Sequence, residues 1–183
     1  MLHFKQLARL EFDVAEVVAV GEELRFGILG RGFIITAEVN GEDLAQAYQK
    51  ADEADQSGIL QQFGTLLGRL HDCGFFGSTR LNDIIYSGTP RSNPKLTLID
   101  RETRTPCPRT TGRKDILERL LLNVRRQIQA GEHFNKQQRS GAYESYCSSL
   151  STEHNVTSAQ LLPETIVLTG CKERKRSEQG GSN

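Results

Sequence analysis

The sequence has no tryptophan, one methionine and no excess charge, because 23 lysines and arginines balance 23 aspartates and glutamates among 183 residues. A neutral chain argues against general binding of nucleic acid or anionic membranes, which requires clustered positive charge. No apolar run approaches the ~20 residues that span a bilayer, and no apolar signal-peptide segment is present at the N-terminus. We therefore expect a cytoplasmic protein, long enough for one domain with a core of its own.

Residues that commonly bind metals are few and scattered. Cys73, Cys107, Cys147 and Cys171 form no C-x-x-C pair, and the four histidines are far apart in the sequence. These spacings match no zinc pattern. We expect isolated, reduced thiols, as is usual in a reducing compartment.

The apolar periodicity predicts a mixed α+β fold. Two helices, over 58–73 and 114–128, carry apolar faces that include Phe63 and Leu120, and we expect them to form the core of a mainly helical lobe. The tail from residue 171 has no apolar content and is expected to be disordered. The other expected elements are a helix ending near 11, extended segments at 17–25 and 32–39, a helix capped by Asn40 or Asp43, strands at 83–86 and 95–99, and a weaker helix at 137–150.

Four stretches in this order resemble the lipopolysaccharide core kinases, a bacterial family with a protein-kinase-like fold that phosphorylates Kdo or heptose sugars. Residues 7–44 resemble the path from the C-helix to the hinge, and GTLLGRLHDCGFF at 64–76 resembles the helix entering the catalytic loop. LTLIDRETR at 96–104 resembles the strand that carries the metal-binding aspartate. GRKDILERLL at 112–121 resembles the start of the following helix.

The resemblance implies a partial kinase-like domain over residues 1–150. Within it, residues 1–40 would be an N-lobe remnant with the hinge, and residues 41–150 would be the C-lobe. Residues 151–183 would form an extension. Because Met1 falls inside what resembles the C-helix, we expect an N-terminally truncated member of the family.

Asp100, at the end of LTLID, matches the metal-binding aspartate of the family, and Asp83 stands where the family has a metal-binding asparagine. The resemblance implies that these two carboxylates share one magnesium ion and that the backbone of Glu38 and Val39 meets an adenine edge. The expected ligands are therefore ATP and Mg²⁺, bound weakly. The alternatives are that Asp100 caps a turn and that Asp83 caps a strand.

The catalytic loop departs from the family pattern, because Ser78 occupies the expected aspartate position, or Thr79 does if no gap is introduced. A hydroxyl without an activating partner is a poor general base at neutral pH. We therefore assign no catalytic residue. His71, in LHDCG, is interpreted as a structural hydrogen-bonding residue, and Arg113 with Asp115 resembles a pair that supports the loop.

The parts that hold the phosphates in a kinase are also missing. No G-x-G-x-x-G segment precedes a strand, and Lys5 lies on a predicted helix. The glycine-rich segment 27–32 joins two extended segments and is interpreted as a hairpin loop. We favour a pseudokinase or remnant. The alternatives are an active ATP-dependent kinase acting on Kdo or heptose, and a non-enzymatic interaction module with an unknown protein partner.

Overall fold

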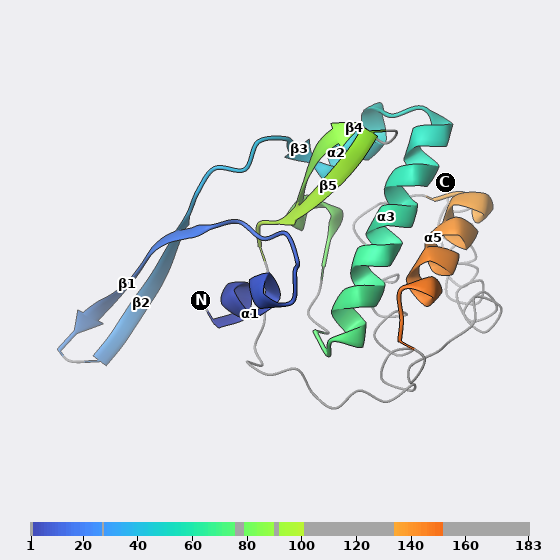
Figure 1. Ribbon diagram of the computed structural model, residues 1–183. Coiled ribbons are helices and arrows are strands. Elements are labelled where there is room, and N and C mark those ends of the chain that lie inside the picture. The colour runs from blue at the N-terminus through green and yellow to red at the C-terminus, as the bar shows by residue number, and fades with distance from the viewer. Residues whose placement is uncertain (1, 27, 76–78, 90–91, 101–133, 152–183) are drawn as a thin grey trace, which may run out of the picture. The chain divides into compact units, whose positions relative to one another are not determined.

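The computed structural model describes residues 2–26, 28–75, 79–89, 92–100 and 134–151 (Figure 1). The chain divides into two compact units. The strand unit is Met1–Ala51 with Leu81–Pro106, and the helical unit is Asp52–Arg80 with Cys107–Asn183. Several predicted features lie outside the described residues: Ser78, Arg113, Asp115, the helix at 114–128 with Leu120, and the tail from 171.

The strand unit contains all of the described strands, arranged as a two-stranded sheet and a three-stranded sheet of order β3-β4-β5. Every pairing between these strands is antiparallel. Together with the helices of the other unit, these small sheets confirm a mixed α+β fold. The elements are α1 (Leu2–Arg9), β1 (Val17–Arg25), β2 (Ile28–Thr36), β3 (Glu42–Asp43), α2 (Leu44–Lys50), the 3-10 turn η1 (Leu81–Asp83), β4 (Ile84–Thr89) and β5 (Ser92–Leu98).

The β1–β2 hairpin turns more tightly than the sequence predicted. Strand β1 has the expected bounds, but β2 begins at Ile28, which pairs with Arg25. The interpretation of 27–32 as a loop is therefore wrong. Phe26 adopts a left-handed conformation with φ 53°, so the chain reverses within two residues and the later glycines lie inside the strand.

A glycine in β1 makes room for an aromatic ring from β2. Gly21 pairs with Phe33 across the hairpin, and a Cβ atom added at Gly21 would collide with the Phe33 ring. An aromatic side chain that covers a cross-strand glycine is a known way to stabilise such a position.

Backbone hydrogen bonds tie the base of the hairpin to the end of β5. The Leu98 amide donates to Asp13 O at 3.0 Å, and the Ala15 amide donates to Leu98 O at 2.9 Å. One residue further on, the Ala37 amide donates to Glu16 O at 2.8 Å. The chain leaving β2 and the C-terminal end of β5 therefore belong to one hydrogen-bonded network.

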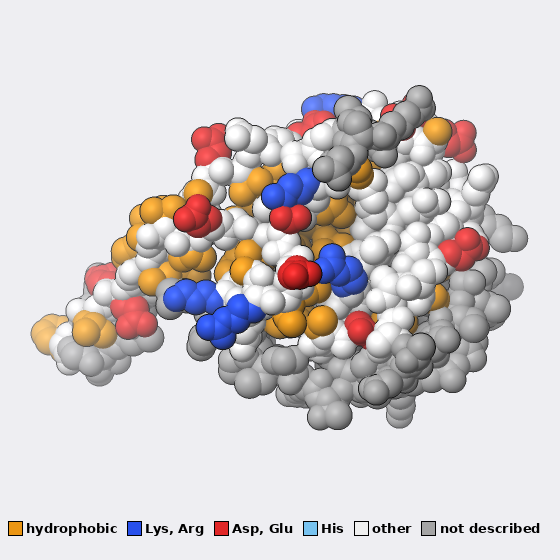
Figure 2. Space-filling view, viewed as in Figure 1, with side chains coloured by type: hydrophobic (Ala, Val, Ile, Leu, Met, Phe, Trp, Pro, Cys, Tyr) orange, Lys and Arg blue, Asp and Glu red, His pale blue; other side chains and the backbone are white. Residues whose placement is uncertain are grey.

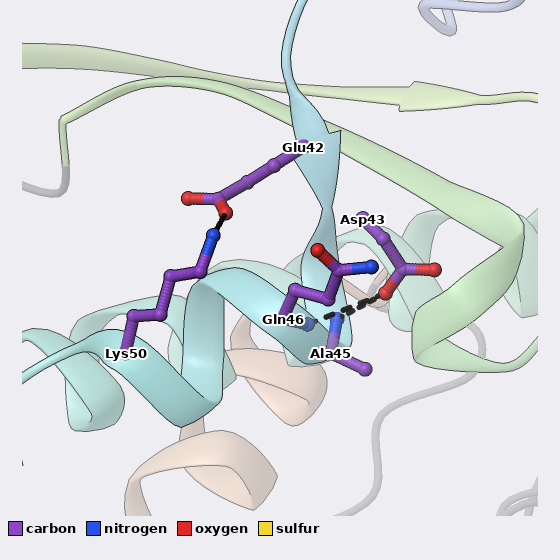
Figure 3. Close-up of polar contacts among 5 residues, drawn as sticks. All are labelled: Glu42, Asp43, Ala45, Gln46 and Lys50. Carbon is purple, nitrogen blue, oxygen red and sulfur yellow. Dashed lines mark hydrogen bonds and ion pairs between the residues drawn. The ribbon is translucent and has the colours of Figure 1, made fainter.

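Asp43, rather than Asn40, caps helix α2, which begins at Leu44. The Asp43 carboxylate accepts hydrogen bonds from the amides of Ala45, at 2.8 Å, and Gln46, at 3.4 Å (Figure 3). These bonds satisfy amides that have no partner within the helix. Lys50, in the last turn, pairs with Glu42 just before the cap (Figure 3).

The helical unit contains α3 (Glu53–Asp72) and α5 (Lys136–Ser148). Helix α3 starts five residues before the predicted 58, because Asp52 caps it by accepting from the Asp55 amide at 2.8 Å. It ends as predicted: Gly74 has φ 78°, and the following Phe75 amide donates to Leu70 O at 2.8 Å. A left-handed glycine with this bond is a frequent helix ending.

Two glycines on α3 let α5 approach its backbone. A Cβ added at Gly64 would collide with Ala142 O, and one added at Gly68 would lie 2.6 Å from Tyr146 O. The buried side chains of α3, including Phe63, flank these glycines, so this part of the predicted helical core is confirmed. Among the described helices, none is long and apolar enough to span a membrane.

Candidate nucleotide and metal site

The structure places Asp83 and Asp100 at the same end of the β4–β5 pair. Asp83 ends η1 directly before β4, and Asp100 follows β5 by two residues. Strand residues Ile84 and Leu98 are paired, and the Ile99 amide donates to Asp83 O at 3.0 Å. The backbones that carry the two carboxylates are therefore held next to each other by hydrogen bonds.

The two carboxylates differ in their access to solvent. Asp83 is 5% exposed, whereas Asp100 is exposed. A buried carboxylate is stable only when it has polar partners, and Asp83 does interact with neighbouring groups. Asp100 is therefore the carboxylate that an incoming ligand can reach from solvent.

In the described part of the chain, no group of three or more histidine, cysteine, aspartate or glutamate side chains is placed to hold a metal ion. Two carboxylates alone would make a poor protein-only site. Magnesium, however, is commonly bound through one or two carboxylates together with the phosphates of a substrate. Magnesium binding by Asp83 and Asp100 together with a nucleotide therefore stays a prediction.

The predicted hinge, with Glu38 exposed and Val39 half-buried, lies between β2 and β3. Its start is held by the hydrogen bond from Ala37 to Glu16, and its end by the pairing of Glu42 with Tyr86. Gly41, in between, has φ 142°, and a Cβ there would collide with Tyr86 O. The link is thus anchored at both ends, whereas contact with an adenine edge stays a prediction.

The described structure makes Thr79 a poor alternative to Ser78 as the residue at the base position. Thr79 is only 1% exposed and already interacts with neighbouring groups. A general base must come within hydrogen-bonding distance of the hydroxyl that it deprotonates. The alignment with Ser78 at this position therefore stays the preferred one, although Ser78 itself is not described.

His71 has the structural role that was predicted for it. Its side chain is fully buried, and Nδ1 lies 2.9 Å from the hydroxyl oxygen of Tyr146. The two rings meet edge to face with centroids 5.6 Å apart. Burial, with smaller contributions from the charges of Cys147 and Asp72, raises the pKa of Tyr146, so its hydroxyl stays protonated. No signal in the sequence pointed to Tyr146 as the partner, because it lies 75 residues from His71.

Cys73 and Cys147 are free thiols, as predicted; Cys107 and Cys171 lie outside the described residues. Burial raises the pKa of Cys73, and the Asp72 carboxylate adds to the effect while Arg69 opposes it. Burial also raises the pKa of Cys147 to about 11. Because the thiolate is the reactive form, neither thiol is suited to nucleophilic catalysis at neutral pH.

No protein-family model and no curated protein sequence matches the chain. Its fold is similar to a solved structure of WaaP in complex with acyl carrier protein, with a TM-score of 0.61. The similarity extends over 95% of this chain and 72% of that one, at 14% sequence identity. At this identity the similarity shows the fold alone, a mixed helix and strand fold that is consistent with the predicted partial kinase-like domain.

Proposed function

We propose that this chain is a kinase-like protein of the lipopolysaccharide core kinase type that binds a magnesium–nucleotide complex weakly and does not transfer phosphate. The observation that carries the proposal is the placement of Asp83 and Asp100. They lie at one end of the β4–β5 pair, with the Ile99 amide bonded to Asp83 O, within a fold similar to WaaP.

Weak binding follows from the charges available to the ligand. Two carboxylates attract a divalent cation, but they repel the phosphates of a nucleotide that arrives without one. A kinase offsets this repulsion with a lysine on the phosphates and a glycine-rich loop that covers them. The sequence offers no such loop, and its candidate Lys5 lies on α1 (Leu2–Arg9) rather than on a strand. Magnesium is therefore essential for binding.

The lack of phosphate transfer follows from the residue at the base position. Phosphoryl transfer depends on positioning and charge stabilisation, with an aspartate accepting the proton of the attacking hydroxyl. Ser78 stands at that position by resemblance, and an unactivated serine cannot accept the proton at neutral pH. General-base assistance is worth about 10²–10⁴-fold where it operates, so its loss would leave transfer too slow to matter.

Isothermal titration calorimetry tests the binding site. We expect weak binding of ATP with magnesium, no binding without magnesium, and loss of binding in Asp100→Asn. Glu22→Gln is the matched control, because Glu22 is an exposed carboxylate of the same unit on β1, and it should bind as the unaltered chain does. Tight binding that survives Asp100→Asn would contradict the assignment of the site.

A radiolabel-transfer assay on lipopolysaccharide core oligosaccharide tests the missing base. The unaltered chain should show no turnover above the protein-free reaction. Turnover gained by Ser78→Asp would support the assignment of position 78. Clear turnover by the unaltered chain, abolished by Asp100→Ala, would instead establish the alternative, an active kinase acting on Kdo or heptose.

A further inference from the structure

The β1–β2 hairpin exposes an unusual amount of apolar side chain. Figure 2 shows these side chains along the hairpin, beside a few acidic ones. An isolated two-stranded hairpin is marginally stable in water, and three or more strands are usually needed. The exposed apolar residues of the hairpin are Val18, Val20, Leu24, Phe26, Phe33, Ile34 and Ile35, with exposed fractions from 47% to 104%.

The apolar side chains lie on both faces of the hairpin. Val20 pairs with Ile34, and these side chains share one face because residues directly opposite each other point to the same side. Phe33 and Ile35 alternate with Ile34 and therefore lie on the other face. Strands that are apolar on both faces are typical of the interior of a sheet. The hairpin thus has the side-chain pattern of central strands.

The outer edge of β2 carries backbone groups that point away from β1. The Ala37 amide donates to Glu16 on the β1 side, and hydrogen-bonding direction alternates along an antiparallel strand. Gly32, Ile34 and Thr36 therefore direct their N–H and C=O groups to the outer edge. In the part of the chain that the structure describes, β1 is the sole strand paired with β2.

The charge pattern distinguishes this edge from the edge of β1. Residues 32–37, GFIITA, contain no charge and no proline, whereas the middle of β1 carries Glu22 and Glu23. Like charges directly opposite each other destabilise strand pairing, so two β1 strands would repel each other. Two β2 strands would not, and an uncharged, exposed strand edge is a template for another strand.

We propose that β2 pairs antiparallel with β2 of a second copy of this chain, forming a four-stranded sheet across a two-fold axis at Ile34. Of the symmetric registers that the outward groups permit, this one pairs Gly32 with Thr36 and Phe33 with Ile35. It keeps all five pairs within the uncharged stretch. The Phe33–Ile35 pairs are aromatic–β-branched contacts, a favourable class of cross-strand pair.

Proline substitutions on the full chain, followed by sedimentation velocity, test this edge. Ile34→Pro removes an outward N–H group while leaving the bonds to β1 intact, which is why proline is tolerated at such positions. Two amide hydrogen bonds are lost per dimer, so the dissociation constant should rise about 10- to 100-fold. Val20→Pro is the matched control. Val20 pairs with Ile34, has nearly the same exposure (47% against 48%), and directs its N–H to the outer edge of β1.

We expect the unaltered chain and Val20→Pro to sediment as dimers and Ile34→Pro to sediment as a monomer with unchanged circular dichroism. If Ile34→Pro fails to fold, Ile34→Lys decides, because it keeps the amide and places two like charges at the axis. If the unaltered chain sediments as a monomer, the proposal is overturned, and the edge of β2 would instead be a binding site for a strand of another protein. A dimer that survives both Ile34 variants, or that Val20→Pro disrupts, would also overturn it.

Discussion

The close approach of α3 and α5 gives the sharpest prediction about stability. Gly64 faces the backbone of α5, so that a Cβ atom there would collide with Ala142 O and lie 3.1 Å from the carbonyl carbon of that residue. Favourable contacts between carbon atoms lie at about 3.5–4.0 Å. Gly64→Ala therefore forces the two helices apart, because a backbone oxygen cannot rotate away as the end of a side chain can.

The size of the effect is a difference between two contributions. Overpacking a well-packed interior costs about 1–3 kcal/mol. Replacing a glycine inside a helix with alanine stabilises the helix by about 1 kcal/mol, because alanine has the higher helix propensity. Because the added Cβ would collide with a backbone atom, the upper part of the overpacking range, about 2–3 kcal/mol, applies. We therefore expect Gly64→Ala to lower the free energy of unfolding by about 1–2 kcal/mol. For a chain of this length, that corresponds to a thermal midpoint about 2–8 °C lower.

Gly141→Ala, on α5, is the matched control. A Cβ there would meet Gln61 Nε2 at 3.0 Å and Cγ at 3.4 Å. This exposed, flexible side chain can move aside. The propensity gain should then dominate, and the free energy of unfolding should rise by about 0.5–1 kcal/mol. Urea denaturation followed by circular dichroism measures both. Equal changes of the same sign in the two variants would refute the close-packing argument.

Three further measurements address the helical unit. Phe63→Ala should lower the free energy of unfolding by about 2–5 kcal/mol, because it removes a buried side chain; an unchanged thermal midpoint would show that this face is not packed. Tyr146→Phe should lower the free energy of unfolding by about 1–3 kcal/mol, because it removes the hydroxyl hydrogen-bonded to the buried His71 Nδ1. An unchanged free energy of unfolding in urea denaturation would show that this hydrogen bond does not stabilise the fold. The raised pKa of Cys147, about 11 in the folded chain, favours the neutral thiol. Because the pKa of Cys147 is higher in the folded than in the unfolded chain, the neutral thiol stabilises the fold at pH values below the ordinary thiol pKa. This stabilisation should be lost as the pH rises through about 11. Unfolding curves over alkaline pH, compared with Cys147→Ser, test this sign.

Local signals in the sequence predicted elements well where the physical cause is local. Gly74 ends α3 because a left-handed residue is needed there, and Asp43 caps α2 because its carboxylate reaches the adjacent amides. The start of α3 was missed because its first turn follows Asp52 and is polar, whereas the apolar spacing begins only at Ile59. Periodicity reports burial, and an exposed first turn gives no periodic signal.

Features that depend on distant pairing were not predictable from spacing. The hairpin loop was misplaced because Gly30 and Gly32 were interpreted as turn residues, whereas both lie within β2. Gly32 pairs with Glu22, and Gly30 lies at a shift in the register. The partner of His71 could not be named, because it comes from a helix 75 residues away. The neighbouring positions of Asp83 and Asp100 were anticipated through family resemblance and not through periodicity. Their backbone geometry depends on the pairing of β4 with β5.

That pairing also bears on the proposed function, because it holds the proposed metal ligands independently of the proposed base position. The positions of Asp83 and Asp100 are set by strand hydrogen bonds, including the bond from Ile99 to Asp83 O, which need no particular residue in the preceding loop. A base at position 78, in contrast, depends entirely on the side chain found there, and serine cannot supply it. Substitution of the base would therefore abolish transfer without disturbing the strands that hold the carboxylates. The proposed function therefore predicts that nucleotide binding and phosphate transfer are separable, with Asp100→Asn affecting the first and Ser78→Asp the second.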